Sequence, residues 1–101
     1  MAKRHVDLKE KVGADPEQVP LLKKNPDQVF WRNKTDRGHT IIFTAWPFVE
    51  PFQNIEVPAK GNSKTFTVYK GAANGAYGYA IVPSINPPSG PPGDPSVLVG
   101  D

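Results

Sequence analysis

Short alternations of apolar and polar residues run along most of the chain and predict β-strands. The clearest lies at 28–33, where Val29 and Trp31 occupy one face while Phe30 and Arg32 occupy the other. A repeat of two residues is the spacing of a strand that is buried on one side. The strands predicted in this way are 3–12, 19–22, 28–33, 39–44, 55–57, 64–69, 76–82 and 97–99.

Turn-forming residues separate these strands and indicate the fold. The runs Gly13-Ala14-Asp15-Pro16 and Lys60-Gly61-Asn62 are typical turn sequences, and Pro20 places its strand at a sheet edge. No segment has the periodicity of an amphipathic helix. About eight short strands with turns between them indicate an all-β Greek-key β-sandwich. A chain of 101 residues is long enough for one domain, spanning 1–101.

Composition narrows the chemistry that such a sandwich can carry. The chain has 12 prolines, 9 glycines, no cysteine and a net charge of +2. Without cysteine it has no disulfide, thiolate ligand or thiol nucleophile. No apolar run approaches the roughly 18 residues of a membrane span, and no lysine or arginine follows Lys70, so we expect neither membrane nor nucleic-acid binding. No catalytic triad spacing or phosphate loop is present, so we expect no enzymatic activity.

Four segments occur in an order and spacing typical of one family of small β-sandwiches. The first holds Asn33 and His39 on either side of a short loop that leads into an apolar strand. The others are a glycine turn with the strand Thr-Phe-Thr-Val (61–68), the strand Gly-Ala-Tyr-Gly-Tyr (75–79) and a closing strand (95–99). Across residues 20–100 the chain therefore resembles the small blue-copper proteins, the cupredoxins. The resemblance implies a cupredoxin-like Greek-key sandwich of about seven or eight strands.

The copper chemistry of that family does not carry over in the same way. Its copper needs two histidines, a cysteine and usually a methionine, and His39 matches the first ligand. The cysteine position falls near Ile81, while the other histidine is His5 and the one methionine is Met1. We therefore expect no type 1 copper site and no cofactor. One alternative stays open, in which His39 combines with His5, Asp36 or residues of a second copy in a cysteine-free copper site.

An apolar loop at 45–53, interrupted by two prolines, is the first candidate for a binding surface. It carries Trp46, Phe48 and Phe52. Loops lie at protein surfaces, so these aromatic side chains either cover one end of the core or form an exposed patch for a partner.

A second loop, 83–95, holds six of the twelve prolines and stands where the family has its ligand segment. The resemblance implies that both loops share the end of the sandwich that carries the metal in cupredoxins. We therefore expect an interaction surface at that end in place of the metal site. Its residues would be Trp46, Phe48, Phe52, Pro87, Pro88 and Pro91.

Taken together, the sequence predicts a non-enzymatic module that binds a protein partner or a second copy of itself. The alternatives are metal handling through His39 and carbohydrate binding through Trp46 and tyrosine side chains. The chain opens with basic residues, but Asp7 follows Val6 directly, so the apolar stretch of a signal peptide is missing. As written, the chain is expected in the cytoplasm, or outside it if a signal peptide has been removed.

Overall fold

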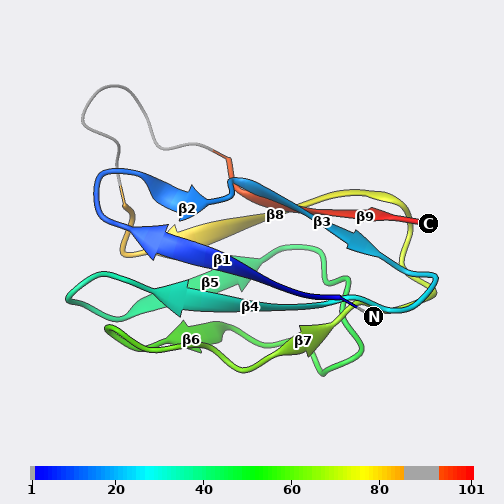
Figure 1. The fold of residues 1–101 in the computed structure, drawn as a ribbon, viewed down its shortest axis with the longest axis horizontal. Helices are drawn as coiled ribbons and strands as arrows, with labels where there is room; N and C mark the ends of the chain where they lie inside the picture. The colour runs from blue at the N-terminus through cyan, green and yellow to red at the C-terminus, as the bar shows by residue number, and fades with distance from the viewer. Residues whose placement is uncertain (1, 86–93) are drawn as a thin grey trace.

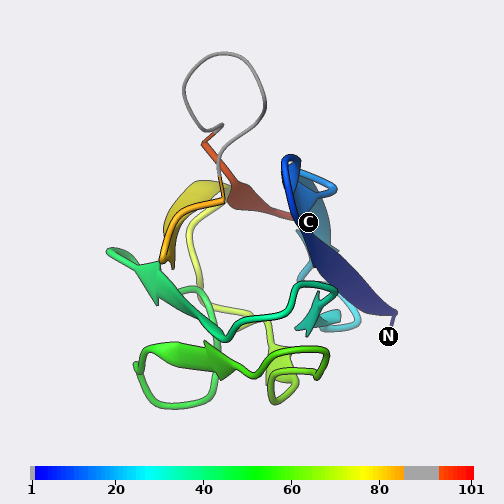
Figure 2. The same cartoon turned by 90° about the vertical axis from the view of Figure 1, so that its left-hand side faces the viewer.

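The computed structural model describes residues 2–85 and 94–101, which form two β-sheets packed face to face (Figures 1 and 2). The strands are β1 (Lys3–Lys9), β2 (Gly13–Asp15), β3 (Gln18–Leu22), β4 (Gln28–Asn33), β5 (His39–Phe43), β6 (Ile55–Val57), β7 (Phe66–Thr67), β8 (Gly75–Val82) and β9 (Ser96–Gly100). One sheet has the order β2-β1-β4-β7 and the other β3-β9-β8-β5-β6. The predicted all-β sandwich is confirmed. The described ranges contain no helix, and so none long and apolar enough to cross a membrane.

Two parallel strand pairs set the topology. Strand β1 pairs in parallel with β4, and β3 pairs in parallel with β9, whereas the other named pairs are antiparallel. The chain forms the β1–β2 hairpin in the first sheet and then crosses to the second sheet, where β3 lies at the edge. The N-terminal quarter therefore contributes strands to both layers and joins them, an arrangement that alternation within each strand does not predict.

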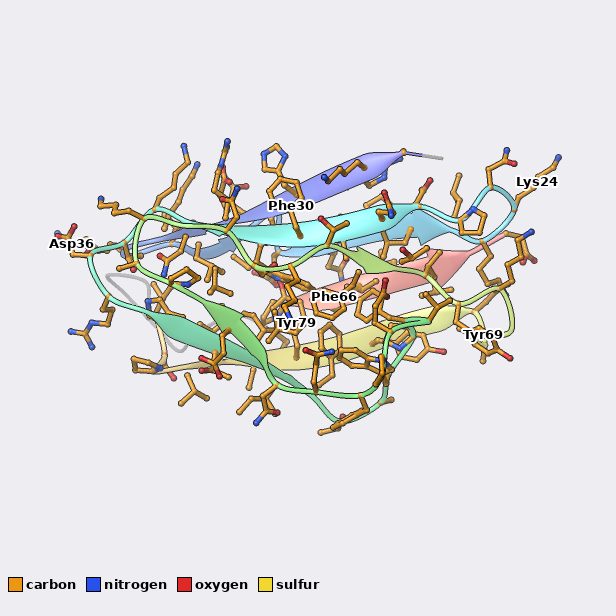
Figure 3. The ribbon with its side chains drawn as sticks, turned by 90° about the horizontal axis from the view of Figure 1, so that it is seen from below. Lys24, Phe30, Asp36, Phe66, Tyr69 and Tyr79 are labelled. Atoms are coloured by element: carbon orange, nitrogen blue, oxygen red, sulfur yellow. The ribbon has the colours of Figure 1, made fainter. Side chains whose placement is uncertain are left out.

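The core lies between the sheets and is built from the inward faces that the alternation predicts. In β4, Val29 and Trp31 are fully buried, and in β5 Ile41 and Phe43 are buried. The Trp31 ring lies edge to face with Phe43 at 6.0 Å and with Tyr79 at 5.4 Å between centroids, an arrangement that aromatic rings favour. Figure 3 shows Phe66 and Tyr79 between the layers and Phe30 on the outer side of its sheet.

The turn predicted at Gly13–Pro16 is wrong, because residues 13–15 form strand β2. The chain reverses three residues earlier, around Lys11, and Leu8 pairs with Ala14 across the hairpin. Lys11 has a φ of 64° and Gly13 a φ of 91°, so positive backbone angles on both sides of Val12 make this tight reversal. Strand β1 consequently ends at Lys9, and the described residues hold nine strands where about eight were expected.

The described parts of the two candidate loops lie at opposite ends of the sandwich, which corrects the expectation that they share one end. Strands β5 and β8 are antiparallel, with Thr40 opposite Val82 and Phe43 opposite Tyr79. The segment after β8 therefore begins beside the start of β5, while the loop after β5 leaves from its other end (Figure 1). We call these the histidine end, which contains His39, and the aromatic end, which contains the loop 44–54. In Figure 3, Asp36 marks the histidine end and Tyr69 the aromatic end.

Candidate functional site

The loop 44–54 packs its aromatic residues onto the core at the aromatic end. The Trp46 ring packs against Phe48 with 5.0 Å between ring centroids, and Phe48 packs against Phe43 with 5.5 Å between centroids. Trp46 also meets Phe66 at 5.6 Å. Most of these contacts are edge to face, so each ring presents its positive edge to the negative face of the next. The loop thus continues the core instead of hanging free of it.

The three aromatic side chains predicted for this surface differ in how far each is exposed to solvent. Phe48 is only 5% exposed, because its backbone forms a bridge with Val68 that turns both side chains inward. Trp46 is half-buried against the core. Phe52 is 59% exposed and rests on Trp46 at 5.2 Å between ring centroids. Phe48 therefore belongs to the core beneath the loop, whereas Phe52 forms part of the molecular surface.

Hydrogen bonds hold this loop in one conformation. The Trp46 indole Nε1–H donates to the carbonyl oxygen of Glu50 at 2.6 Å. The backbone N–H of Thr67 donates to Glu50 Oε1 at 2.8 Å, and the N–H of Val49 donates to the Thr67 carbonyl at 2.9 Å. These bonds tie the loop to β7, so a partner would not need to order it on binding.

We define the aromatic surface as Val49, Phe52 and Tyr69. Val49 is 57% exposed and Tyr69 is also exposed. The bridge between Phe48 and Val68 turns their neighbours Val49 and Tyr69 outward, because side chains alternate along paired strands. The predicted surface included Phe52 but neither of the other two. The alternation along 64–69 already predicts that Tyr69 points outward, whereas the outward direction of Val49 follows only from pairing between segments far apart in the chain.

At the histidine end, His39 is buried and both of its ring nitrogens have partners. Its Nδ1 lies 2.8 Å from the carbonyl oxygen of Pro83 and donates to it, since a carbonyl oxygen only accepts. Its Nε2 lies 3.1 Å from Thr35 Oγ1. The ring therefore fastens the start of β5 both to the segment after β8 and to the loop before β5.

Asn33 organises the loop that leads to His39. Its Nδ2 donates to the carbonyl oxygens of Arg37 at 2.7 Å and Val57 at 3.1 Å. Its Oδ1 accepts from the Thr35 backbone N–H at 2.8 Å and from Thr35 Oγ1 at 2.7 Å. This buried amide thus makes the hydrogen bonds that a tight loop cannot make with its own backbone.

The structure does not bring the other proposed metal ligands to His39. His5 lies in β1, 3.3 Å from an Arg32 nitrogen and 3.8 Å from Asp7. Asp36 pairs with Lys60 at 3.3 Å. Within residues 2–85 and 94–101, no three His, Cys, Asp or Glu residues are grouped so that they could hold a metal ion. The predicted surface residues Pro87, Pro88 and Pro91 lie outside the described residues.

Solved structures similar to this chain include variants of amicyanin, a cupredoxin. A reduced amicyanin with a proline-to-phenylalanine substitution has a TM-score of 0.67 and 16% identity, covering 97% of this chain and 82% of that one. An oxidised amicyanin with a methionine-to-lysine substitution has a TM-score of 0.65 and 17% identity over the same shares of the two chains. A reduced Cu(I) form at pH 4, with a proline-to-glycine substitution, has a TM-score of 0.64 and 18% identity, covering 99% and 84%.

Neither a protein-family model nor a curated protein matches the chain. At such low identity the structural likeness shows the fold alone. The chain is thus a cupredoxin-like β-sandwich with no cysteine and, in the part that the structure describes, no metal-binding group.

Proposed function

We propose that this cupredoxin-like sandwich is a non-enzymatic module for protein interaction or assembly, acting through the aromatic surface. The observation that carries the proposal is Phe52, a large side chain 59% exposed to water yet held in place against Trp46. Interface residues that dominate binding are typically aromatic side chains held by their surroundings. Burial of apolar surface contributes about 25 cal/mol per Å², so covering Phe52 and Val49 favours association.

The residues at the histidine end do not fit the copper that the fold family implies. A copper site needs several ligands around one point, whereas the Nδ1 of His39 donates to the Pro83 carbonyl, its Nε2 faces Thr35 Oγ1, and no group of three possible ligands occurs in the described residues. Ile81 stands near the position of the family's cysteine and supplies no ligand atom. We therefore derive no step through copper, and a Cu(II) titration followed by electron paramagnetic resonance should show no stoichiometric site.

Replacement of Phe52 by serine tests the proposal without disturbing the core. The matched pair Val49→Ser and Val82→Ser removes the same side chain at two places, since Val82 is 49% exposed but lies at the histidine end. We expect Phe52→Ser to weaken association by about tenfold or more, the effect of losing a dominant interface residue. Val49→Ser should weaken it less, and Val82→Ser should not change it.

Association is measured by sedimentation velocity over a concentration series, and by comparing what each variant retains from an extract of its source cells. Urea unfolding checks that the three variants stay within about 0.5 kcal/mol of the parent, as exposed substitutions do. If the parent, Phe52→Ser and Val82→Ser behave alike in both measurements, the proposal is wrong. Replacing Phe48 would not serve, because this buried side chain holds the core itself together.

A further inference from the structure

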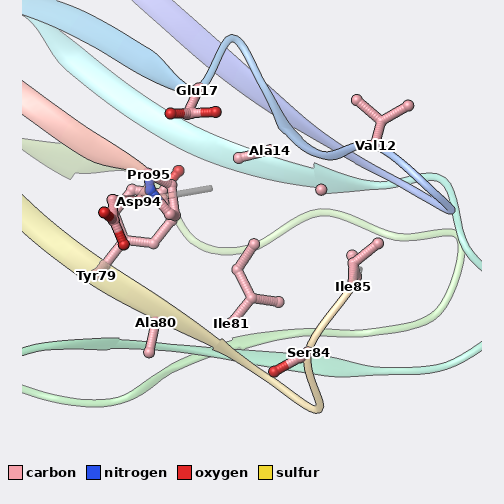
Figure 4. A pocket seen from close by; sticks show the side chains of 11 residues that line it. Val12, Ala14, Glu17, Tyr79, Ala80, Ile81, Ser84, Ile85, Asp94 and Pro95 are labelled. Carbon is pink, nitrogen blue, oxygen red and sulfur yellow. The ribbon is translucent and has the colours of Figure 1, made fainter. Parts of the chain in front are cut away.

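A cavity of about 190 Å³ opens at the histidine end, between the β1–β2 hairpin and the end of β8 (Figure 4). One part of its wall is apolar and includes Val12, Ala14, Ile81 and Ile85. Sites for drug-sized ligands usually measure roughly 300–1,000 Å³, so this cavity suits a smaller molecule. It lies at the opposite end from the aromatic surface and is independent of the function proposed there.

A buried phenol forms part of the cavity wall. Tyr79 lines the cavity and is only 7% exposed, and its hydroxyl oxygen is buried. Burial raises the pKa of Tyr79 to about 12; a hydrogen bond with the neighbouring Trp31 indole opposes this rise and the Glu17 carboxylate adds to it. The hydroxyl thus stays neutral, so it adds no charge to the cavity.

The charge of the lining selects the kind of ligand. Glu17 and Asp94 both face the cavity, and none of the described residues that line it is basic. Neither carboxylate pairs with a lysine, arginine or histidine in the described ranges. Two uncompensated acids stand out on a chain whose net charge is +2, and they favour a cation over a neutral molecule or an anion.

Backbone hydrogen bonds fix the positions of these groups. The N–H of Ser96 donates to the Glu17 carbonyl at 2.9 Å, and the N–H of Tyr79 donates to the Pro95 carbonyl at 3.1 Å. The backbone of Glu17, and that of Pro95 next to Asp94, are thereby held beside β9 and β8. A site whose groups are in place before binding loses less free energy to ordering.

We propose that this cavity binds a small organic ammonium ion with an aliphatic chain. The ammonium group lies against the carboxylates of Glu17 and Asp94. The aliphatic chain packs against Ile81 and Ile85. The acidic and the apolar parts of the lining thus match the charge and the apolar body of one molecule.

Three probes of equal chain length and different charge test this site. Hexylammonium, 1-hexanol and hexanoate are titrated into the protein, and binding is followed by NMR through the amide signals of Gly13, Ala80 and Ile81 in the lining. Hexylammonium should bind most tightly and hexanoate most weakly. If all three shift these signals with equal affinity, the hollow is merely apolar. That result, or the absence of any shift, overturns the proposal.

Single substitutions separate the contributions of the lining. Glu17→Gln and Asp94→Asn should each weaken hexylammonium binding by about two- to fivefold, the range of an exposed charge pair, and leave hexanol binding unchanged. Tyr79→Phe should preserve the fold and leave hexylammonium binding unchanged, since the hydroxyl that it removes is buried. Glu56→Gln, at an exposed position outside the cavity, is the matched control. Parent-like hexylammonium binding by the Glu17→Gln, Asp94→Asn double variant would contradict the assignment.

Discussion

At the scale of single residues, Asn33 determines the shape of the histidine end. Its amide joins three stretches of backbone, because it bonds to Thr35 and Arg37 within the loop and to Val57 on β6. The side chain is buried, so water cannot replace these bonds when they are lost. His39 depends on the same network through its contact with Thr35 Oγ1. The asparagine that contributed to the family resemblance therefore has a structural role of its own.

Replacing Asn33 by alanine should lower the free energy of unfolding by about 2–4 kcal/mol, since it leaves several buried polar groups unpaired. Thr35→Val keeps the shape of the side chain and removes only its hydroxyl, so it should cost about 1–2 kcal/mol. Asn25→Ala, at an exposed position, is the matched control and should change stability by less than about 0.5 kcal/mol. Urea unfolding followed by tryptophan fluorescence measures all three, and equal costs for Asn33→Ala and Asn25→Ala would refute the role.

At the scale of elements, the alternation of apolar and polar residues predicted which side chains of a strand point inward, but not which strands pair. The inward faces of β4 and β5 follow from a repeat of two, which needs no knowledge of the rest of the chain. Strand β2 was missed because Gly13 and Pro16 have turn chemistry, whereas pairing with β1 makes this segment a strand. Pairing between distant segments also decides that Phe48 points inward and that the two loops lie at opposite ends.

The cavity was missed for a related reason. Tyr79 appeared in the sequence as one of several strand aromatics, and Glu17 and Asp94 as isolated acids in loops. Nothing in their spacing, 62 and 15 residues from Tyr79, marks them as neighbours. They come together because β3 pairs with β9 and β9 pairs with β8.

The tight β1–β2 hairpin gives a prediction at this scale. Gly13 has a φ of 91°, a conformation that an L-residue adopts only with strain, so Gly13→Ala should destabilise the protein by about 1–2 kcal/mol. A Cβ at this position would meet only an ordinary contact, 3.7 Å from the Ile85 carbonyl oxygen, so the backbone angle is the cause. Gly38→Ala is the control: its Cβ has similar space, 3.8 Å from the Val57 carbonyl oxygen, without a positive φ. In thermal and urea unfolding, Gly13→Ala should be clearly less stable than Gly38→Ala, and the reverse order of stability would count against the explanation.

At the scale of the whole molecule, two carboxylates join parts of the fold that are distant in the sequence. Asp7 on β1 accepts hydrogen bonds from Arg32 on β4 at 2.8 Å and 3.1 Å. This bidentate pair joins the two parallel strands, in which Asp7 and Arg32 lie opposite each other. Asp27 accepts from the backbone N–H groups of Ala2 at 2.9 Å and Leu22 at 3.0 Å. It thereby fixes the N-terminus beside the end of β3. Both carboxylates hold their positions as anions, which makes the stability of the fold dependent on pH.

The direction of that dependence follows from the pKa values. The hydrogen bond from Arg32 lowers the pKa of Asp7, although burial opposes it. Burial alone would raise the pKa of Asp27, but the N–H groups of Leu22 and Ala2, together with Arg4, lower it below its usual value of 3.8. Near that pH the unfolded chain therefore binds more protons than the folded protein. The stability from these two groups is complete above pH 3.8 and is lost as the pH falls through their folded-state pKa values.

Asp27→Asn should show this dependence most directly. At pH 7 it should cost about 1–3 kcal/mol, because an amide cannot accept both backbone bonds as well as a carboxylate does. Asp15→Asn, which breaks only an exposed pair with Lys9, should change the stability much less at the same pH. Between pH 5 and pH 2 the free energy of unfolding should fall less steeply for Asp27→Asn than for the parent, since one of the groups that takes up a proton on unfolding is gone. A parent-like slope for this variant, measured by urea unfolding at a series of pH values, would show that Asp27 does not couple proton binding to the join between the N-terminus and β3.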